Sequence, residues 1–116
     1  MAITKEVVLE KMKDKETVVL DVLPKTDYEM LNIKGSFSLP IVGMRPEDFA
    51  RVVEQKYGRD RFFITYCSGF PCRHFQEAAD ALVKQGLRAE GYPGGIQEWA
   101  ESGLPVEGTQ AGQETS

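Results

Sequence analysis

Two uninterrupted apolar runs, residues 17–22 and 62–66, leave this chain few possible folds. Both runs are rich in β-branched and aromatic residues and have the length of a single strand. A strand that faces water on one side alternates apolar and polar residues, whereas uniformly apolar strands are typical of parallel sheets covered on both faces. Helical patterns alternate with these runs. The sequence therefore predicts an α/β fold with a central parallel sheet of about five strands and helices on both faces.

Apolar spacing and capping residues predict the remaining elements. Helices are expected after an N-cap at Thr4, after a second at Thr26, and then over residues 46–57, about 74–85 and 96–102. The second of these helices covers residues 27–31, and further strands are expected over residues 37–39 and 87–91. We therefore predict one domain over residues 1–106, followed by a disordered polar tail over residues 107–116.

The composition argues against several classes of protein. The 116 residues, 41% of them hydrophobic, suffice for one domain with one core. No apolar run approaches the ~18 residues that cross a bilayer, and the N-terminus lacks the apolar core of a signal peptide. We therefore expect a cytoplasmic monomer that does not bind membranes. A net charge of -4 with scattered Lys and Arg argues against a nucleic-acid partner.

The chemistry is expected in one loop, which follows the apolar run 62–66 and holds both cysteines. Its sequence is Cys67-Ser68-Gly69-Phe70-Pro71-Cys72-Arg73. The next helix begins at once, and the free N–H groups of a helix N-terminus favour a thiolate, which is the reactive form of cysteine. Ligands of parallel sheets collect at the carboxyl ends of the strands. Cys67 is therefore the candidate nucleophile, and a reducing cytosol favours two thiols over a disulfide.

A series of short motifs along the chain resembles a known family. In chain order the motifs are Leu20-Asp21-Val22, residues 27–40, Ile64-Thr65-Tyr66-Cys67, Ala78-Ala79 with Leu82, Gly86-Leu87, Gly94-Gly95-Ile96 with Trp99, and residues 103–106. In this order they resemble a single rhodanese domain, and the resemblance spans about residues 4–106. The fold that it implies is the one that the apolar runs predict.

The resemblance also implies a reaction. In rhodanese sulfurtransferases a cysteine thiolate, here Cys67, attacks the outer sulfur of a donor such as thiosulfate or a persulfide and becomes a persulfide. The sulfur then passes to cyanide or to a thiol, which can belong to a protein. No cofactor is implied. The residues expected to bind the substrate are those of the loop: Ser68, Gly69, Phe70, Pro71, Cys72 and Arg73.

The loop departs from the usual sulfurtransferase pattern. Five residues separate Cys67 from Arg73, where four are usual, and Leu23 and Asn32 replace a common arginine and histidine. Five intervening residues also mark rhodanese-fold phosphatases and arsenate reductases. Those enzymes need loop N–H donors around an oxyanion, and Pro71 has none. A third rhodanese-like group has Cys-x-Gly-x-x-Cys at this position, and this chain resembles that group most.

Several side chains keep alternative roles. Cys72 can attack a persulfide or sulfenate on Cys67, as in a redox-sensing module, or it can pack beneath the loop. Arg73 can bind an anion or remain solvated, and His74 can support a thiolate or remain solvated. A metal is not expected, because Cys67, Cys72 and His74 give only three ligands at unusual spacing. Asp21, Gly94 and Gly95 are candidates for bracing the loop.

Overall fold

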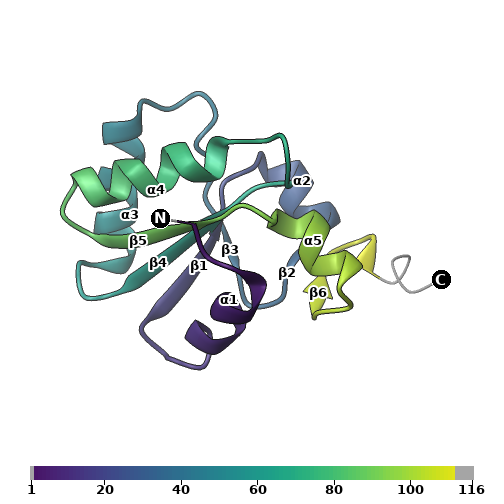
Figure 1. Ribbon diagram of the computed structural model, residues 1–116. Helices are drawn as coiled ribbons and strands as arrows, with labels where there is room; N and C mark the ends of the chain where they lie inside the picture. Colours follow the sequence, from purple (N-terminus) through teal and green to yellow (C-terminus); the bar gives the residue numbers. More distant parts are fainter. Residues whose placement is uncertain (1, 112–116) are drawn as a thin grey trace.

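The two apolar runs form the central strands of a parallel sheet in the computed structural model, which describes residues 2–111. Strand β1 (Thr17–Asp21) pairs in parallel with β4 (Phe62–Tyr66). Strand β3 (Phe37–Ser38) flanks β1, and β5 (Arg88–Tyr92) flanks β4, which gives the order β3-β1-β4-β5 (Figure 1). The predicted fold class is confirmed, although the sheet has four strands rather than about five.

Helices cover both faces of this sheet (Figure 1). Helices α3 (Pro46–Tyr57) and α4 (His74–Lys84) pack on one face, and α1 (Lys5–Lys11) and α5 (Gly95–Glu101) pack on the other. Each face has its own apolar cluster, and the two clusters take alternate residues of the central strands. This alternation follows from the two-residue period of a strand.

The alternation fixes the side of the sheet on which the candidate nucleophile lies. Phe63 and Cys67 belong to the cluster beneath α3 and α4, whereas Ile64 and Tyr66 belong to the cluster beneath α1 and α5. Cys67 is in phase with Phe63 along the strand direction. Its side chain therefore faces the start of α4 rather than α1.

A small second sheet joins distant parts of the chain. Strand β2 (Asn32–Ile33) pairs antiparallel with β6 (Val106–Glu107). Beyond β6, the N–H groups of Thr109 and Gln110 donate to the carbonyls of Glu29 and Met30. The predicted disordered tail is thus wrong for residues 107–111, because their backbone groups pair with β2 and with the end of the preceding helix. Residues 112–116 lie outside the described residues.

The helix boundaries follow the predictions closely, with one difference. Thr4 caps α1, and its side chain accepts from the Val7 N–H at 3.3 Å. Helix α2 (Lys25–Met30) begins two residues before its predicted start, with Pro24 rather than Thr26 at the N-cap. The Pro24 carbonyl accepts from the N–H groups of Asp27 and Tyr28, and the fixed φ of proline favours a helix that starts after it.

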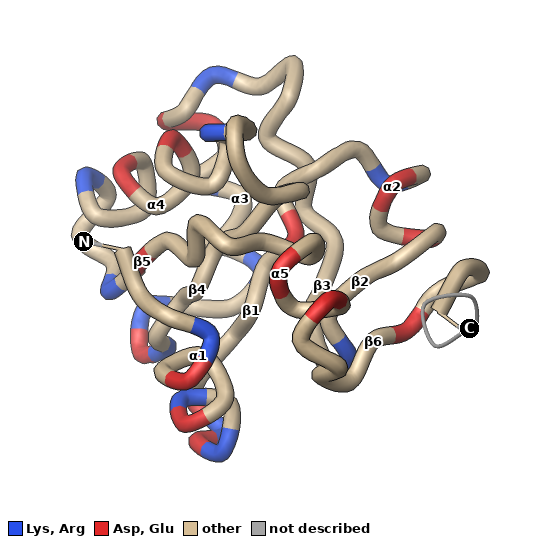
Figure 2. Tube along the Cα trace, turned by 45° about the vertical axis from the view of Figure 1, so that its right-hand side comes forward, with Lys and Arg blue, Asp and Glu red and all other residues tan. Residues whose placement is uncertain are grey.

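Charged residues of both signs occur along the chain (Figure 2). Figure 2 shows basic and acidic residues interspersed on α1, with acidic residues on α5. Among residues 2–111, no helix is long and apolar enough to span a bilayer.

Candidate active site

The Cys67 thiol is buried at the carboxyl end of β4, with 1% of the residue exposed. The backbone N–H groups of Gly69 and Phe75 act on its sulfur and lower the pKa of Cys67, against the effect of burial. Phe75 is the second residue of α4, so its N–H is one that the helix itself leaves without a partner. The helix N-terminus predicted beside Cys67 is therefore present, and it is aimed at the sulfur.

These donors do not make Cys67 acidic in this structure. Burial raises the pKa of the Cys67 thiol to about 12, and its hydrogen bond to Cys72 adds to the increase, against the opposing effect of the two N–H groups. The expectation that the loop favours a thiolate at Cys67 is wrong for this conformation. The physical reason is that desolvation of a buried charge outweighs two backbone dipoles.

The pKa of Cys72 is shifted in the opposite direction. Burial raises the pKa of Cys72, but hydrogen bonds from the Cys67 thiol and from the N–H groups of His74 and Ser68 outweigh this effect, so that the pKa is lowered. Cys72 is also less buried than Cys67. The two thiols therefore titrate as one pair, in which the pKa of Cys67 is raised and the pKa of Cys72 is lowered.

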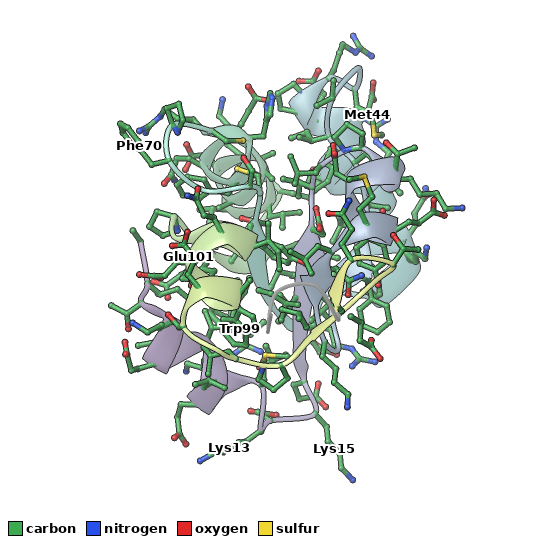
Figure 3. All side chains as sticks on the ribbon, turned by 90° about the vertical axis from the view of Figure 1, so that its right-hand side faces the viewer. Lys13, Lys15, Met44, Phe70, Trp99 and Glu101 are labelled. Atoms are coloured by element: carbon green, nitrogen blue, oxygen red, sulfur yellow. The ribbon has the colours of Figure 1, made fainter. Side chains whose placement is uncertain are left out.

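A tight turn positions Cys72 over the thiol of Cys67. The Cys72 N–H donates to the Gly69 carbonyl at 2.8 Å, and the Phe70–Pro71 peptide bond inside this turn is cis. Turns with a cis proline at their third position form a known class. Phe70 is 92% exposed at the tip, and Figure 3 shows it at the outer edge of the molecule. Pro71 is exposed beside it.

The other half of the loop is held by the start of α5. The N–H groups of Ile96 and Gln97 donate to the carbonyls of Cys67 and Ser68, at 3.0 and 2.9 Å. Gly95 has φ +65°, and a Cβ at that position would lie 2.5 Å from the Cys67 carbonyl oxygen. Only glycine fits this contact. Gly94, also a predicted site residue, comes immediately before α5 at its N-cap.

Arg73 and His74 lie where the loop meets α4, and both are exposed. The Arg73 side chain forms no ion pair with any residue between 2 and 111. It lines a cavity of about 220 Å³ together with Cys72 and the other residues Phe70, Pro71, Phe75 and Pro93. A cationic residue and one of the two cysteines thus share one opening.

A second cavity, of about 400 Å³, lies on the Ser68 side of the loop. Its other lining residues are Leu23, Asp27, Met30, Leu31, Ile96 and Gln110. This cavity contains neither cysteine and no basic side chain. We therefore regard the smaller cavity as the opening to the thiols.

Asp21 is not brought to the thiols. It follows Leu20, which lies on the Cys67 side of the sheet, and its carboxylate faces the other side, near Tyr66. Oδ1 accepts from the Leu23 N–H at 2.9 Å, while Oδ2 has no partner among the described residues. Burial raises the pKa of Asp21 to about 6. Asp21 thus braces the chain after β1, as the sequence suggests, without touching the reactive sulfurs.

The sequence interpretation missed Thr65 and Tyr66. The buried Thr65 hydroxyl donates to the Phe75 carbonyl at 2.7 Å and fixes the first turn of α4. The Tyr66 hydroxyl accepts from the Ile33 N–H at 3.0 Å and lies 2.8 Å from Ser36 Oγ. The signal in the sequence was the presence of hydroxyl side chains inside an otherwise apolar run. A buried polar group needs a hydrogen-bond partner, so such hydroxyls indicate specific contacts.

A metal centre is not evident in the part of the chain that the structure describes. No three side chains of His, Cys, Asp or Glu gather there in a way that could hold an ion.

Comparisons with known proteins agree with this geometry. A transcriptional regulator of the HTH type from Mycobacterium tuberculosis, Rv0324, is 30% identical over 106 residues, which are 91% of this chain and 44% of the regulator. The chain thus spans less than half of that relative. The BH2092 protein of Bacillus halodurans has a similar structure, with a TM-score of 0.79 and 25% identity over 93% of this chain and 77% of that one.

A rhodanese-related protein from Thermoplasma volcanium is also similar, with a TM-score of 0.67 and 27% identity over 91% of this chain and 96% of that one. The rhodanese-like domain family itself matches residues 4–102, which is most of the chain. The motif order, the parallel sheet and the cysteine loop at the end of its central strand agree with this match. The chain therefore belongs to the rhodanese-like domain family.

Proposed function

We propose that the chain is a sulfurtransferase that carries sulfane sulfur as a persulfide on Cys67. The observation that supports this best is the position of Cys67 at the end of a central strand, with the N–H groups of Gly69 and Phe75 directed at its sulfur. Such fixed donors stabilise negative charge without reorganising. A persulfide anion on Cys67 is the charge that they would stabilise.

The neighbouring thiol supplies the base that Cys67 needs. The pKa of Cys72 is lowered by its hydrogen bond with the Cys67 thiol and by nearby N–H groups, which together outweigh the effect of its burial. Transfer of the proton along this hydrogen bond leaves a thiolate on Cys67 and a thiol on Cys72. The arrangement is that of a nucleophile and an adjacent general base.

Arg73 favours a sulfur donor that is an anion. Arg73 lines the same cavity as Cys72, and its side chain forms no ion pair within residues 2–111. Thiosulfate carries negative oxygens that a guanidinium binds well. The acceptor is proposed to be a thiol, of a small molecule or of a protein cysteine, because exposed Phe70 and Pro71 border the opening and offer apolar contact to an incoming molecule.

The test is direct. Reduced protein is incubated with thiosulfate, and the intact mass is followed for wild type, Cys67→Ser and Cys72→Ser. We expect sulfur to leave the donor, and sulfite to appear, with wild type and with Cys72→Ser but not with Cys67→Ser. The proposal fails if neither of the two chains that keep Cys67 reacts while a known rhodanese does so in parallel.

A redox-sensing module is the second candidate, and two observations favour it. The thiols of Cys67 and Cys72 interact directly. The chain also resembles part of a protein named as a transcriptional regulator. In this function peroxide oxidises one thiolate to a sulfenate, and the other thiol displaces water to form a disulfide. If both thiols can still be alkylated after peroxide treatment, this candidate is excluded.

A further inference from the structure

Cys72 is placed to react with the sulfur that Cys67 carries. Cys67 is in the apolar cluster beneath α4, and Cys72 packs against that same cluster from above. The turn closed by the Cys72 N–H and the Gly69 carbonyl at 2.8 Å brings Cys72 back over the end of β4. The two side chains interact directly as a result. A thiol held in this way meets any persulfide on Cys67 before a second molecule can.

The surroundings favour a thiolate at Cys72 and an exit for an anion. The backbone groups of Ser68 and His74 lower the pKa of Cys72. Cys72 lines the cavity of about 220 Å³, which it shares with Arg73. Cys67 itself is only 1% exposed. An outside acceptor therefore has to pass Cys72 to reach the outer sulfur, whereas a small anion can leave past Arg73.

We propose that Cys72 is a second reactive residue, which converts the Cys67 persulfide into a Cys67–Cys72 disulfide and releases the transferred sulfur as hydrosulfide. This inference rests on the proposed persulfide on Cys67. It makes hydrosulfide, rather than a persulfidated acceptor, the product of one turnover. The loop would then act as a dithiol reductant of sulfane sulfur.

The step balances without an outside oxidant. The proton that Cys72 took from Cys67 passes to the terminal sulfur of the persulfide, so that Cys72 is again a thiolate. This thiolate attacks the inner sulfur, Sγ of Cys67. The bond between that sulfur and the terminal sulfur breaks, and the terminal sulfur leaves as hydrosulfide with the bonding electrons. The sulfane sulfur is reduced, and the two cysteine sulfurs are oxidised to a disulfide. A dithiol reductant must then restore the pair.

The experiment is a single turnover in the absence of oxygen and of free thiol. Reduced wild type, Cys72→Ser and Cys72→Ala receive thiosulfate, and the reaction is followed to its end point because the variants lack the proton acceptor. We expect wild type to release about one sulfide and one sulfite per chain and to lose two hydrogen atoms by mass. Each Cys72 variant should release sulfite alone and keep one added sulfur atom.

A late addition of cyanide separates the two end states. Cyanide should yield thiocyanate from the Cys72 variants, which still hold the persulfide, and none from wild type. If wild type instead keeps the added sulfur and releases no sulfide, Cys72 is not a resolving thiol, although the proposed transferase stands. If neither wild type nor the Cys72 variants release sulfite, the persulfide on Cys67 is excluded and this inference with it.

Discussion

Gly95 lies so close to Cys67 that a Cβ at position 95 would come 2.5 Å from the Cys67 carbonyl oxygen and 2.6 Å from the Gly69 nitrogen. The same segment donates the Ile96 N–H to that carbonyl at 3.0 Å. Two parts of the chain that are distant in sequence thus fix the strand end from which the thiol projects. The loop is held by backbone contacts rather than by side chains.

Gly95→Ala should therefore displace the loop as well as strain the backbone. We expect a loss of about 1–2 kcal/mol for the positive φ and roughly 1–3 kcal/mol more for the collision, together with loss of sulfur loading. Gly103→Ala is the matched control, because Gly103 has φ +76° but nothing within 4 Å of its Cβ position. Urea denaturation and thiosulfate loading measure the two effects. Equal losses of stability in the two variants would contradict the close approach.

Arg73→Ala should weaken the reaction with an anionic donor. Hydrogen bonds to charged groups contribute about 1.5–3 kcal/mol, so the second-order rate with thiosulfate should fall by roughly 10- to 100-fold. Added salt should reduce this difference. Arg51→Ala removes the same charge from α3, where Arg51 pairs with Asp48, and should leave the rate nearly unchanged. Similar rates in both variants would show that Arg73 does not bind the donor.

The Asp21 carboxyl should make stability depend on pH. Its pKa is raised to about 6 by burial, so the folded protein binds this proton more tightly than the unfolded chain does. The contribution of this proton to the free energy of unfolding is fully present below about pH 4. About 2–3 kcal/mol of it is lost as the pH rises through about 6. Asp21→Asn keeps an oxygen for the Leu23 N–H and removes the titration. The difference in unfolding free energy between the two proteins, measured from pH 4 to 8, should shift in favour of the variant; a constant difference would contradict the prediction.

Tyr66→Phe should destabilise the fold through an unpaired backbone group. The Tyr66 hydroxyl accepts from the Ile33 N–H at 3.0 Å inside the core, and without it that donor has no partner. We expect a loss of about 1–3 kcal/mol in thermal or urea unfolding. Tyr57→Phe is the control, because the Tyr57 hydroxyl makes no hydrogen bond to the residues described and should change stability by less than about 0.5 kcal/mol. A Tyr66→Phe protein as stable as this control would argue against the buried network.

The two cysteines should differ in reactivity. Hydrogen bonds from Cys67, His74 and Ser68 lower the pKa of Cys72 despite its burial, whereas burial raises the pKa of Cys67 to about 12. Alkylation near neutral pH should therefore modify Cys72 at least roughly tenfold faster than Cys67, as seen by peptide mass mapping. In Cys67→Ala the pH midpoint for Cys72 should rise, because the side chain that lowers the pKa of Cys72 through a hydrogen bond is removed. Faster labelling of Cys67 in wild type would reverse the assignment of the charge.

The elements of the fold could be predicted because their signals are local. The uniform apolarity of residues 62–66 identifies a central strand, and Pro46 with Gly58 delimits α3. The β2–β6 pairing could not be predicted in the same way. Two-residue strands have too little pattern, and their partners are far apart in the sequence. The segment over residues 107–111 is polar, and its order depends on that pairing.

The sequence alone determined that both thiols share one loop at the carboxyl end of a central strand, because a strand's apolarity and a helix start are written in neighbouring residues. Only the tertiary structure decided that the pKa of Cys67 is raised and the pKa of Cys72 is lowered. The balance depends on burial beneath α4, on a turn that brings Cys72 back, and on N–H groups fixed by packing. Desolvation by residues distant in sequence outweighs the effect of the local helix dipole on the pKa of Cys67. A local sequence pattern does not indicate this desolvation.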